Sequence, residues 1–236
     1  MNNNSIDVSN DIKRCFCEGR TILCLVRHGE SVGNKNRVCL GHTDLDLTDK
    51  GREQAEMTAK ELSDVKFAEI YSSDLIRAMN TARPHAEMRN MSVIPSVQLR
   101  ELYFGKWENA SIDYLLENYH DEFVIGWRGS FGTYTPPDGE YVQDMARRIE
   151  QELCRIASKN VGSNVLVVSH AAAIRALWGR ISGIPKEQVA AAVNFPSNAS
   201  YSVVEYISGS EGERLVPLYY SCDKHLADMI TVIPKV

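Results

Sequence analysis

The fold is decided by residues 21–34, which read TILCLVRHGESVGN. The apolar run from Ile22 to Val26 has the length and composition of a buried parallel strand, and a polar, glycine-bearing loop follows it at Arg27. In open α/β sheets, ligands bind just beyond the carboxyl ends of the strands. The stretch therefore predicts that Arg27 and His28 lie at the functional edge of a parallel sheet.

A guanidinium beside an imidazole suits an anionic ligand, above all phosphate. Guanidinium groups bind tetrahedral oxyanions through two parallel hydrogen bonds, and a neutral imidazole can attack phosphorus. The three residues Arg27, His28 and Gly29 are a short match, so an ordinary strand end with an incidental histidine is the competing interpretation at this point.

Length and composition narrow the class of protein. The chain has 236 residues, 44% of them hydrophobic and 24% charged, which is enough for one large α/β domain. No apolar run approaches the ~20 residues that a membrane helix needs. The net charge of −5 and the pI of 5.7 argue against general nucleic-acid binding, which needs a basic surface. A phosphate site must therefore be a local basic pocket, and we expect no nucleic-acid or membrane partner.

The cysteines and the N-terminus indicate a cytoplasmic location. Six cysteines form no C-x-x-C pair and are typical of reduced thiols in a cytosolic protein. Residues 1–20 are polar and lack the apolar core of a signal peptide, which predicts a frayed or loosely docked arm. Residues 21–236 are expected to form a single domain.

Helical and strand patterns alternate along that domain. A helix capped by Thr48 precedes a strand at 67–72, and a second helix, which Ser73 or Asp74 could cap, is expected to end or kink at Pro84, near Arg83. Further expected elements are a strand at 91–97, a helix at 111–119, an irregular stretch at 126–139, a long helix after Gly139, a strand at 164–169, a helix at 171–181, and closing strands at 201–207 and 215–220. The predicted fold class is α/β, a three-layer open and mostly parallel sheet with helices on both faces. A helical insertion at about 102–139 would stand over the active site.

Three further residues are candidates for the same crevice. The strand at 164–169 ends at His170, so His28 and His170 would face each other if the two strands are neighbours. Arg77 lies one turn into its helix and could reach back to the strand ends. Glu101 precedes an aromatic-rich loop that could shield it from water, surroundings that favour a protonated carboxyl group.

Phosphoryl transfer without a metal needs a nucleophile, cations for the phosphoryl oxygens and an acid for the leaving group. We assign His28 as nucleophile, since neutral imidazole has a lone pair and Arg27 disfavours its protonation. Arg27, Arg77 and His170 would hold the phosphoryl group, and Glu101 would donate the proton. His85, His120 and His225 lack the spacing of metal ligands, and we expect no metal. We also expect no cofactor.

These residues belong to motifs that resemble a known family, the histidine phosphatase superfamily of phosphoglycerate-mutase-like proteins. The resemblance covers nearly all of 21–206 in order. It rests on LVRHGES at 25–31 with Asn34, GHTD at 41–44 with Leu47-Thr48, SSDL at 72–75 with Arg77-Ala78 and Thr81-Ala82, RE at 100–101 with GKWE at 105–108, and SH at 169–170.

The resemblance implies a phosphohistidine intermediate on His28 and no metal. It also implies that Arg27, Arg77 and His170 bind the transferring group, and that Glu101 acts first as acid and then as base for water. Further substrate contacts are expected from Asn34, Ser31, His42, Thr43 and Ala171. Ala171 stands where glycine is commoner in the family, which affects the loop but removes no catalytic group.

Residues after Glu101 favour hydrolysis over isomerisation. Mutases of the family resemble Glu-Arg-x-Tyr-Gly at this point, whereas here Glu101 is followed by LYFG, and the insertion offers Lys106 and Arg128 without an adjacent arginine pair. The run PPDGE at 136–140 resembles the phosphatase branch. We therefore predict a metal-independent phosphomonoester hydrolase acting on a small phosphorylated metabolite. A cofactor-dependent phosphoglycerate mutase and a non-catalytic phospho-ligand binding module are the alternatives, and the oligomeric state stays open, with a homodimer among the options.

Overall fold

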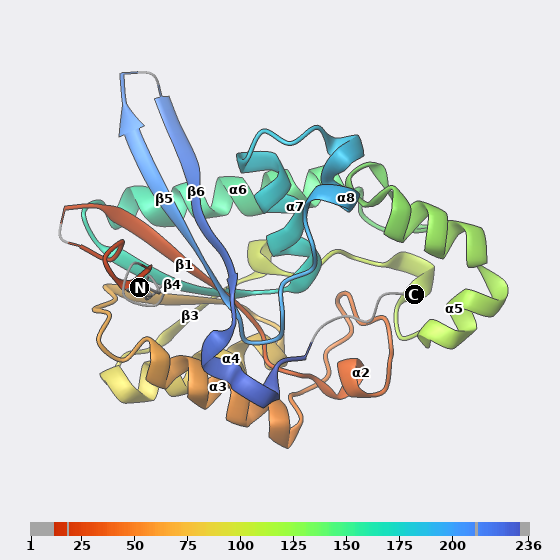
Figure 1. The fold of residues 1–236 in the computed structure, drawn as a ribbon, viewed down its shortest axis with the longest axis horizontal. Helices are drawn as coiled ribbons and strands as arrows, with labels where there is room; N and C mark the ends of the chain where they lie inside the picture. Colours follow the sequence, from red (N-terminus) through yellow and green to blue (C-terminus); the bar gives the residue numbers. More distant parts are fainter. Residues whose placement is uncertain (1–11, 18, 211, 232–236) are drawn as a thin grey trace, which may run out of the picture.

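The computed structural model describes residues 12–17, 19–210 and 212–231, which form a six-stranded sheet (Figure 1). The strands are β1 (Thr21–Arg27), β2 (Glu69–Ser73), β3 (Val93–Ser96), β4 (Asn164–Ser169), β5 (Tyr201–Gly209) and β6 (Gly212–Cys222), in the spatial order β3-β2-β4-β1-β5-β6. β1 to β4 are mutually parallel. At one side of the sheet, β5 pairs antiparallel with β1, and β6 pairs antiparallel with β5. The predicted open, mostly parallel sheet is confirmed.

Helices precede and follow the strands in the predicted alternation. The α-helices are α2 (Val32–Lys35), α3 (Asp49–Glu61), α4 (Ile76–Arg89), α5 (Ile112–Asn118), α6 (Val142–Lys159), α7 (Ala171–Ile181) and α8 (Val189–Ala192). Short 3₁₀ turns are η1 (Val97–Leu99), η2 (Gly105–Trp107), η4 (Phe131–Thr133), η5 (Lys186–Gln188) and η6 (Lys224–Met229), and η3 (Asp121–Gly129) is a π-helix. The turns α2, α8 and η6 were not expected from the sequence.

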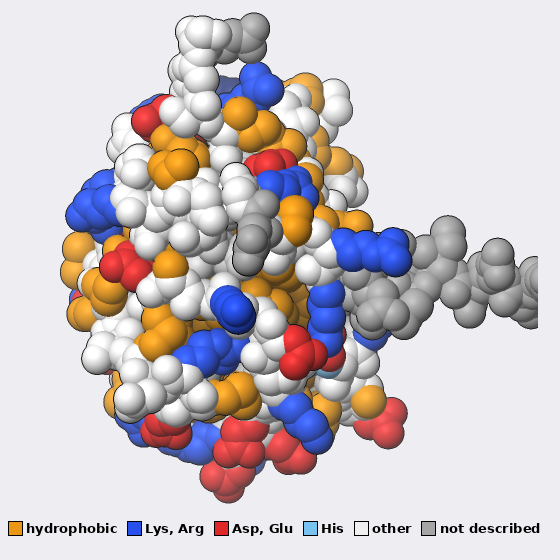
Figure 2. All heavy atoms as spheres, turned by 90° about the vertical axis from the view of Figure 1, so that its left-hand side faces the viewer, with side chains coloured by type: hydrophobic (Ala, Val, Ile, Leu, Met, Phe, Trp, Pro, Cys, Tyr) orange, Lys and Arg blue, Asp and Glu red, His pale blue; other side chains and the backbone are white. Residues whose placement is uncertain are grey.

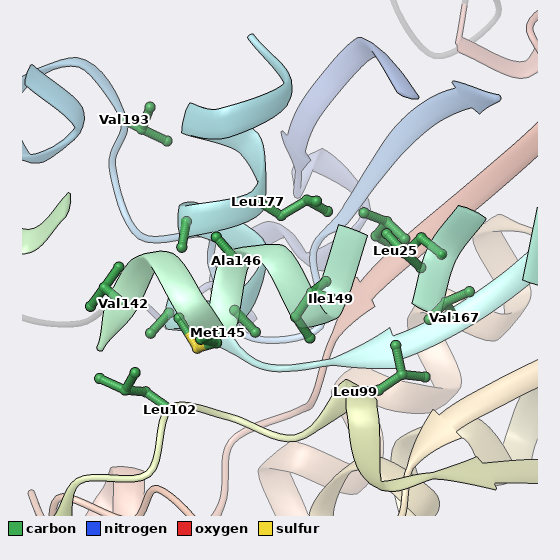
Figure 3. Packing of buried hydrophobic residues seen from close by; sticks show 14 of the residues in the cluster. Leu25, Leu99, Leu102, Val142, Met145, Ala146, Ile149, Val167, Leu177 and Val193 are labelled. Atoms are coloured by element: carbon green, nitrogen blue, oxygen red, sulfur yellow. The ribbon is translucent and has the colours of Figure 1, made fainter. Parts of the chain in front are cut away.

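Both faces of the sheet are covered, which explains why β1 is apolar from Ile22 to Val26. All seven residues of β1 are buried. Ile22, Cys24 and Val26 belong to the core on the side of α3 and α4, whereas Leu23 and Leu25 belong to the core on the side of α6 and α7. Figure 3 shows the second core, where Leu25 and Val167 of the sheet lie near Ile149 of α6 and Leu177 of α7.

The segment between Glu101 and α6 forms its own aromatic cluster beside the strand ends. Trp107 lies edge-on to Phe123 at 5.7 Å between ring centroids, and Trp127 lies edge-on to Phe131 at 5.0 Å. Helix α5 is present as predicted, capped by the Ser111 hydroxyl. The irregular start predicted at 126 is wrong, because the π-helix continues to Gly129. Gly126 fits there because a Cβ would clash with the ring of Tyr134.

Two predictions about α4 are also wrong. The helix continues through Pro84 to Arg89, since the buried side chains of Ala82, His85 and Ala86 keep this stretch packed although proline lacks the N–H donor. Neither Ser73 nor Asp74 caps it: Asp74 instead pairs with Arg100 at 2.5 Å, and Asp44 Oδ1 accepts from the Ile76 N–H at 2.8 Å.

The described part of the N-terminal arm is docked on the sheet. Ile12 is buried, Phe16 lies edge-on to Phe67 with 6.2 Å between ring centroids, and Arg20 pairs with Glu205. Residues 1–11 and 18 of the predicted arm lie outside the described residues.

One face of the molecule carries charged side chains of both signs. Figure 2 looks at the side of the molecule remote from α5 and shows Lys and Arg interspersed with Asp and Glu. Within the described part of the chain, no helix is long and apolar enough to cross a membrane.

Candidate active site

The two histidines that follow β1 and β4 lie side by side. The two strands are neighbours, and Arg27 pairs in register with Ser169, so His28 and His170 leave the sheet at the same edge. Their ring centroids are 5.2 Å apart, with an interplanar angle of 59°. The sequence prediction that these imidazoles face each other is confirmed.

His28 is held as a neutral imidazole with one nitrogen available. Its ring is 4% exposed, and Nδ1 lies 2.7 Å from the carbonyl oxygen of Gly29. Because a carbonyl only accepts, Nδ1 carries the proton and donates it, which leaves the lone pair on Nε2. Burial lowers the pKa of His28 well below its ordinary value, and the charges of Arg77 and Arg27 lower it further.

His170 is fully buried at the N-cap of α7. Burial, followed by the charge of Arg77, lowers its pKa well below the ordinary value. Neither ring nitrogen has a hydrogen-bond partner among the described residues. Burying an imidazole without a hydrogen-bond partner costs free energy, and a bound ligand can supply that partner. His170 is therefore placed to form a hydrogen bond with an oxygen of an anionic ligand.

The two arginines are anchored by carbonyl oxygens. Arg27 Nη1 donates to Pro196 O at 2.6 Å, and Arg77 donates to Thr43 O at 2.8 Å and to Gly41 O at 2.7 Å. Both side chains are 1% exposed, and burial lowers the pKa of each to about 10, so both stay charged at neutral pH. The Nε atoms of both lack a partner among the described residues. Each guanidinium therefore retains capacity for an anion.

Glu101 lies against the first turn of α7. Oε1 accepts hydrogen bonds from the N–H groups of Leu102 at 2.9 Å and Ala173 at 3.0 Å, and Oε2 accepts from the N–H of Ala172 at 3.0 Å. The N–H groups of Ala172 and Ala173 are donors that the N-terminus of α7 leaves unpaired, at the positive end of its dipole. The sequence led us to expect an aromatic loop as the main surroundings; the structure gives the carboxylate main-chain donors instead.

A cavity of about 150 Å³ opens beside these groups. Six of the predicted site residues line it: Arg27, His28, Asn34, Arg77, Glu101 and Ala171. Its remaining wall is largely apolar and includes Val38, Leu40, Phe104, Ile112, Phe123, Trp127 and Phe195, with Arg37 and Arg128 as further cations.

Four predicted residues do not line this cavity but pack behind its wall. His170 contacts His28, and Ser31 caps α2 by accepting from the Asn34 N–H at 3.1 Å. His42 and Thr43 both donate through their N–H groups to Glu108, at 3.0 and 2.8 Å. Glu108 thereby fixes the loop whose carbonyl groups anchor Arg77.

Sequence reasoning missed Asn198 and Thr231, which also line the cavity. Both reach the site through the antiparallel strands: β5 begins at Tyr201, paired with Val26, so the residues just before it lie beside His28. The polar run Ser197-Asn198 before a predicted strand was the available signal, and it required knowing which strand pairs with β1.

Among residues 12–17, 19–210 and 212–231, no group of three or more His, Cys, Asp or Glu side chains is placed to hold a metal ion. Metal-free chemistry remains a prediction, because the described side chains alone do not test it.

Known proteins resemble this chain in sequence and in structure. The adenosylcobalamin/alpha-ribazole phosphatase of Escherichia coli K12 is 32% identical over 165 residues, which cover 70% of this chain and 81% of that protein. A probable phosphoglycerate mutase GpmB of Enterobacter sp. strain 638 is 34% identical over 165 residues, covering 68% and 74%. The structure of mycobacterial glucosyl-3-phosphoglycerate phosphatase in complex with VO3 superposes with a TM-score of 0.79 and 26% identity, covering 86% of this chain and 99% of that one.

The family model matches most of the chain. The model of the histidine phosphatase superfamily (branch 1) matches residues 23–216, a range that begins inside β1 and ends inside β6. The chain therefore belongs to branch 1 of the histidine phosphatase superfamily, and it is an enzyme of that family.

Proposed function

We propose that the protein is a metal-independent phosphomonoesterase that acts on a small phosphorylated metabolite through a phosphohistidine on His28. The observation that carries the proposal is the state of His28: a buried, neutral imidazole with its Nε2 lone pair available, beside His170 and two charged arginines. A nucleophile, cations and an acid within one small cavity are the parts that metal-free phosphoryl transfer requires.

The reaction proceeds in two displacements. In the first, Arg27 and Arg77 hold the phosphoryl oxygens, His28 Nε2 forms a bond to phosphorus, and the ester P–O bond breaks as the leaving oxygen takes a proton from Glu101. In the second, Glu101 removes a proton from water, the water oxygen bonds to phosphorus, and the N–P bond breaks to release phosphate. Asn34 adds a contact to the phosphoryl group, and His170 lies against the attacking ring.

The cavity supports a small organic moiety on the substrate. Its volume of about 150 Å³ and its wall of Phe104, Trp127 and Phe195 suit an apolar or ring-shaped part next to the phosphate. The main-chain contact between the Lys106 N–H and Pro137 O, at 2.9 Å, ties the PPDGE run to this wall. That run and the similarity to two named phosphatases favour hydrolysis. The six cysteines are free, which supports a cytoplasmic location.

A phosphoglycerate mutase is the second candidate, favoured by the 34% identity to a probable GpmB. It requires the phosphohistidine to return its phosphoryl group to a bound sugar acid rather than to water. A bisphosphorylated primer would then stimulate isomerisation of a monophosphoglycerate. Release of inorganic phosphate without isomer would remove this candidate.

The decisive experiment combines hydrolysis with trapping. The wild-type protein is expected to hydrolyse an aryl phosphate in the presence of a chelator and to carry phosphate on His28 after acid-free quenching. His28→Ala is expected to do neither, whereas His120→Ala, at a largely exposed ring that does not line the cavity, keeps the wild-type rate. Equal rates in wild type and His28→Ala would refute the proposal. A trapped phosphohistidine would exclude the non-catalytic binding module.

A further inference from the structure

The main chain of the nucleophile is held from two sides. On one side the His28 N–H donates to Ser169 O of β4 at 3.0 Å. On the other, Ala199 N–H lies 3.1 Å from Arg27 O and 3.3 Å from His28 O, and Arg27 N–H donates to Ser200 O at 3.0 Å. Ala199 is fully buried with a φ of 56°, a left-handed conformation that alanine adopts only where its surroundings impose it. The loop at 197–200 is thus shaped around Arg27 and His28.

Asn198 adds the side-chain contact of this loop. Its Nδ2 donates to His28 O at 3.1 Å and to Asn34 Oδ1 at 3.1 Å, and the residue is 1% exposed. One amide group therefore uses both of its N–H donors on two residues of the cavity wall. Both N–H groups of this amide are used on protein atoms, so neither is left to donate to a substrate.

The orientation of both amides follows from an unambiguous donor. The Ser31 N–H donates to Asn34 at 3.1 Å, so the accepting atom must be Oδ1. The Ser31 hydroxyl also lies 3.0 Å from that oxygen. Because Asn34 Oδ1 faces Asn198 and can only accept, the Asn198 atom that contacts it must be the NH₂ group. The NH₂ of Asn34 is then left for the cavity that Asn34 lines, where it can donate to a phosphoryl oxygen.

The C-terminal residues fix Asn198 in turn. Its own N–H donates to Thr231 O at 2.9 Å. Gln54 donates to Met229 O at 2.6 Å and to Thr231 Oγ1 at 3.0 Å, and its Oε1 accepts from the Glu30 N–H at 2.8 Å. The segment Met229–Thr231 is therefore joined by two amide side chains to the loop that carries His28.

We propose that Asn198 is a positioning residue, which aligns His28 through its carbonyl group and turns the NH₂ of Asn34 toward the transferring phosphoryl group, with Thr231 holding Asn198 in place. The proposal rests on His28 being the nucleophile of the proposed function. In this proposal Asn198 and Thr231, which belong to none of the sequence motifs, affect the rate of phosphoryl transfer.

The test uses Asn198→Asp and Asn198→Ala, with single-turnover formation of phosphohistidine from an aryl phosphate as the readout. The aspartate keeps the shape but has no N–H, so oxygens would face His28 O and Asn34 Oδ1. We expect the rate constant of phosphorylation to fall about 100-fold, the loss associated with slight misplacement of a reacting group, and KM to change less. The affinity for inorganic phosphate should fall as well, because Asn34 is no longer oriented.

Asn160 offers a matched control. It is a buried asparagine at the end of α6 whose Nδ2 also makes two hydrogen bonds, to Glu69 Oε2 at 2.8 Å and to Ile156 O at 3.0 Å, at the opposite edge of the sheet. Asn160→Ala should lower Tm as Asn198→Ala does while leaving the single-turnover rate unchanged. A shared fall in rate that follows Tm in both would overturn the positioning role.

A double-mutant cycle separates positioning from general destabilisation. Asn34→Ala and Asn198→Ala share the bond between Nδ2 and Oδ1, so the double variant should lose less activity than the product of the single losses. Strict additivity, or a wild-type rate in Asn198→Asp, would overturn the inference while phosphohistidine formation in the wild type still supports the proposed function. Absence of phosphohistidine in the wild type would remove both.

Discussion

Glu101→Gln tests the acid role and the contacts that hold this carboxylate. The substitution keeps the size of the side chain but replaces one oxygen by NH₂. Oε1 accepts from two N–H groups and Oε2 from one, so the least disruptive orientation puts the NH₂ against the N–H of Ala172. That orientation loses one hydrogen bond and leaves a buried N–H unpaired.

The expected loss of stability follows from these contacts. An unpaired buried N–H costs about 1–3 kcal/mol. We take about 2 kcal/mol as the free-energy loss, which lowers Tm by about 4–8 °C in a chain of this length. Differential scanning calorimetry at pH 7.5 measures it.

The kinetic effect should depend on the leaving group. General acid catalysis contributes about 10²–10⁴-fold, so phosphorylation of His28 by an alkyl phosphate should slow by that factor. A p-nitrophenyl ester needs little protonation, so its burst should persist while turnover slows, because water attack still requires the base. Quenched-flow measurement of phosphohistidine with both esters separates the two steps.

The control for this variant is Glu152→Gln, another buried glutamate, which pairs with Arg155 and accepts from the Ser96 hydroxyl at 2.6 Å far from the cavity lining. It should lose stability without any dependence on the leaving group. Equal slowing of alkyl and aryl esters by Glu101→Gln would refute the assignment of Glu101 as the proton donor.

Two further predictions concern the packing of the site. Gly29→Ala would drive a Cβ into the carbonyl oxygen of Gly51 in α3, so we expect about 1–3 kcal/mol of destabilisation in urea unfolding together with a lower single-turnover rate; an unchanged midpoint would show that the loop and α3 separate freely. His85 is fully buried, and burial lowers its pKa to about 3, so the unfolded chain binds a proton below about pH 6.5 that the folded chain excludes. His85 therefore costs no folding stability above that pH, and it lowers the free energy of unfolding increasingly as the pH falls below it. His85→Leu should reduce the difference in the free energy of unfolding between pH 7.5 and pH 5 by about 2 kcal/mol relative to wild type. The same pH difference in both proteins would contradict this assignment.

Sequence reasoning reached the parts of the site that follow apolar runs. β1 and β4 are buried on both faces, so their ends were visible as abrupt changes from apolar to polar residues, and His28 and His170 followed directly. Arg77 was accessible because a helix start places its first turn near a strand end. These inferences need only local patterns and the common geometry of parallel sheets.

The remaining parts depend on tertiary contacts that local patterns do not encode. Asn198 reaches His28 because β5 pairs antiparallel with β1, and Thr231 reaches Asn198 because the preceding turn η6 packs against α3. Gly126 resembles a helix break in the sequence, but in the structure it lies inside the π-helix, because the ring of Tyr134 leaves no room for a Cβ at this position. Pro84 resembled a helix end because its effect on hydrogen bonding is local, whereas the packing that keeps α4 continuous is not.

The carbonyl anchors of Arg27 and Arg77 have an electrostatic consequence. Carbonyl oxygens fix the direction of a guanidinium group but carry no formal charge, and the nearby Glu101 carboxylate is engaged by main-chain N–H groups. A molecule with a net charge of −5 thus keeps two cations in its interior without dedicated counter-ions. In the proposed function, the phosphate dianion of the substrate balances these two positive charges. We therefore expect singly charged anions such as chloride to compete with it only weakly.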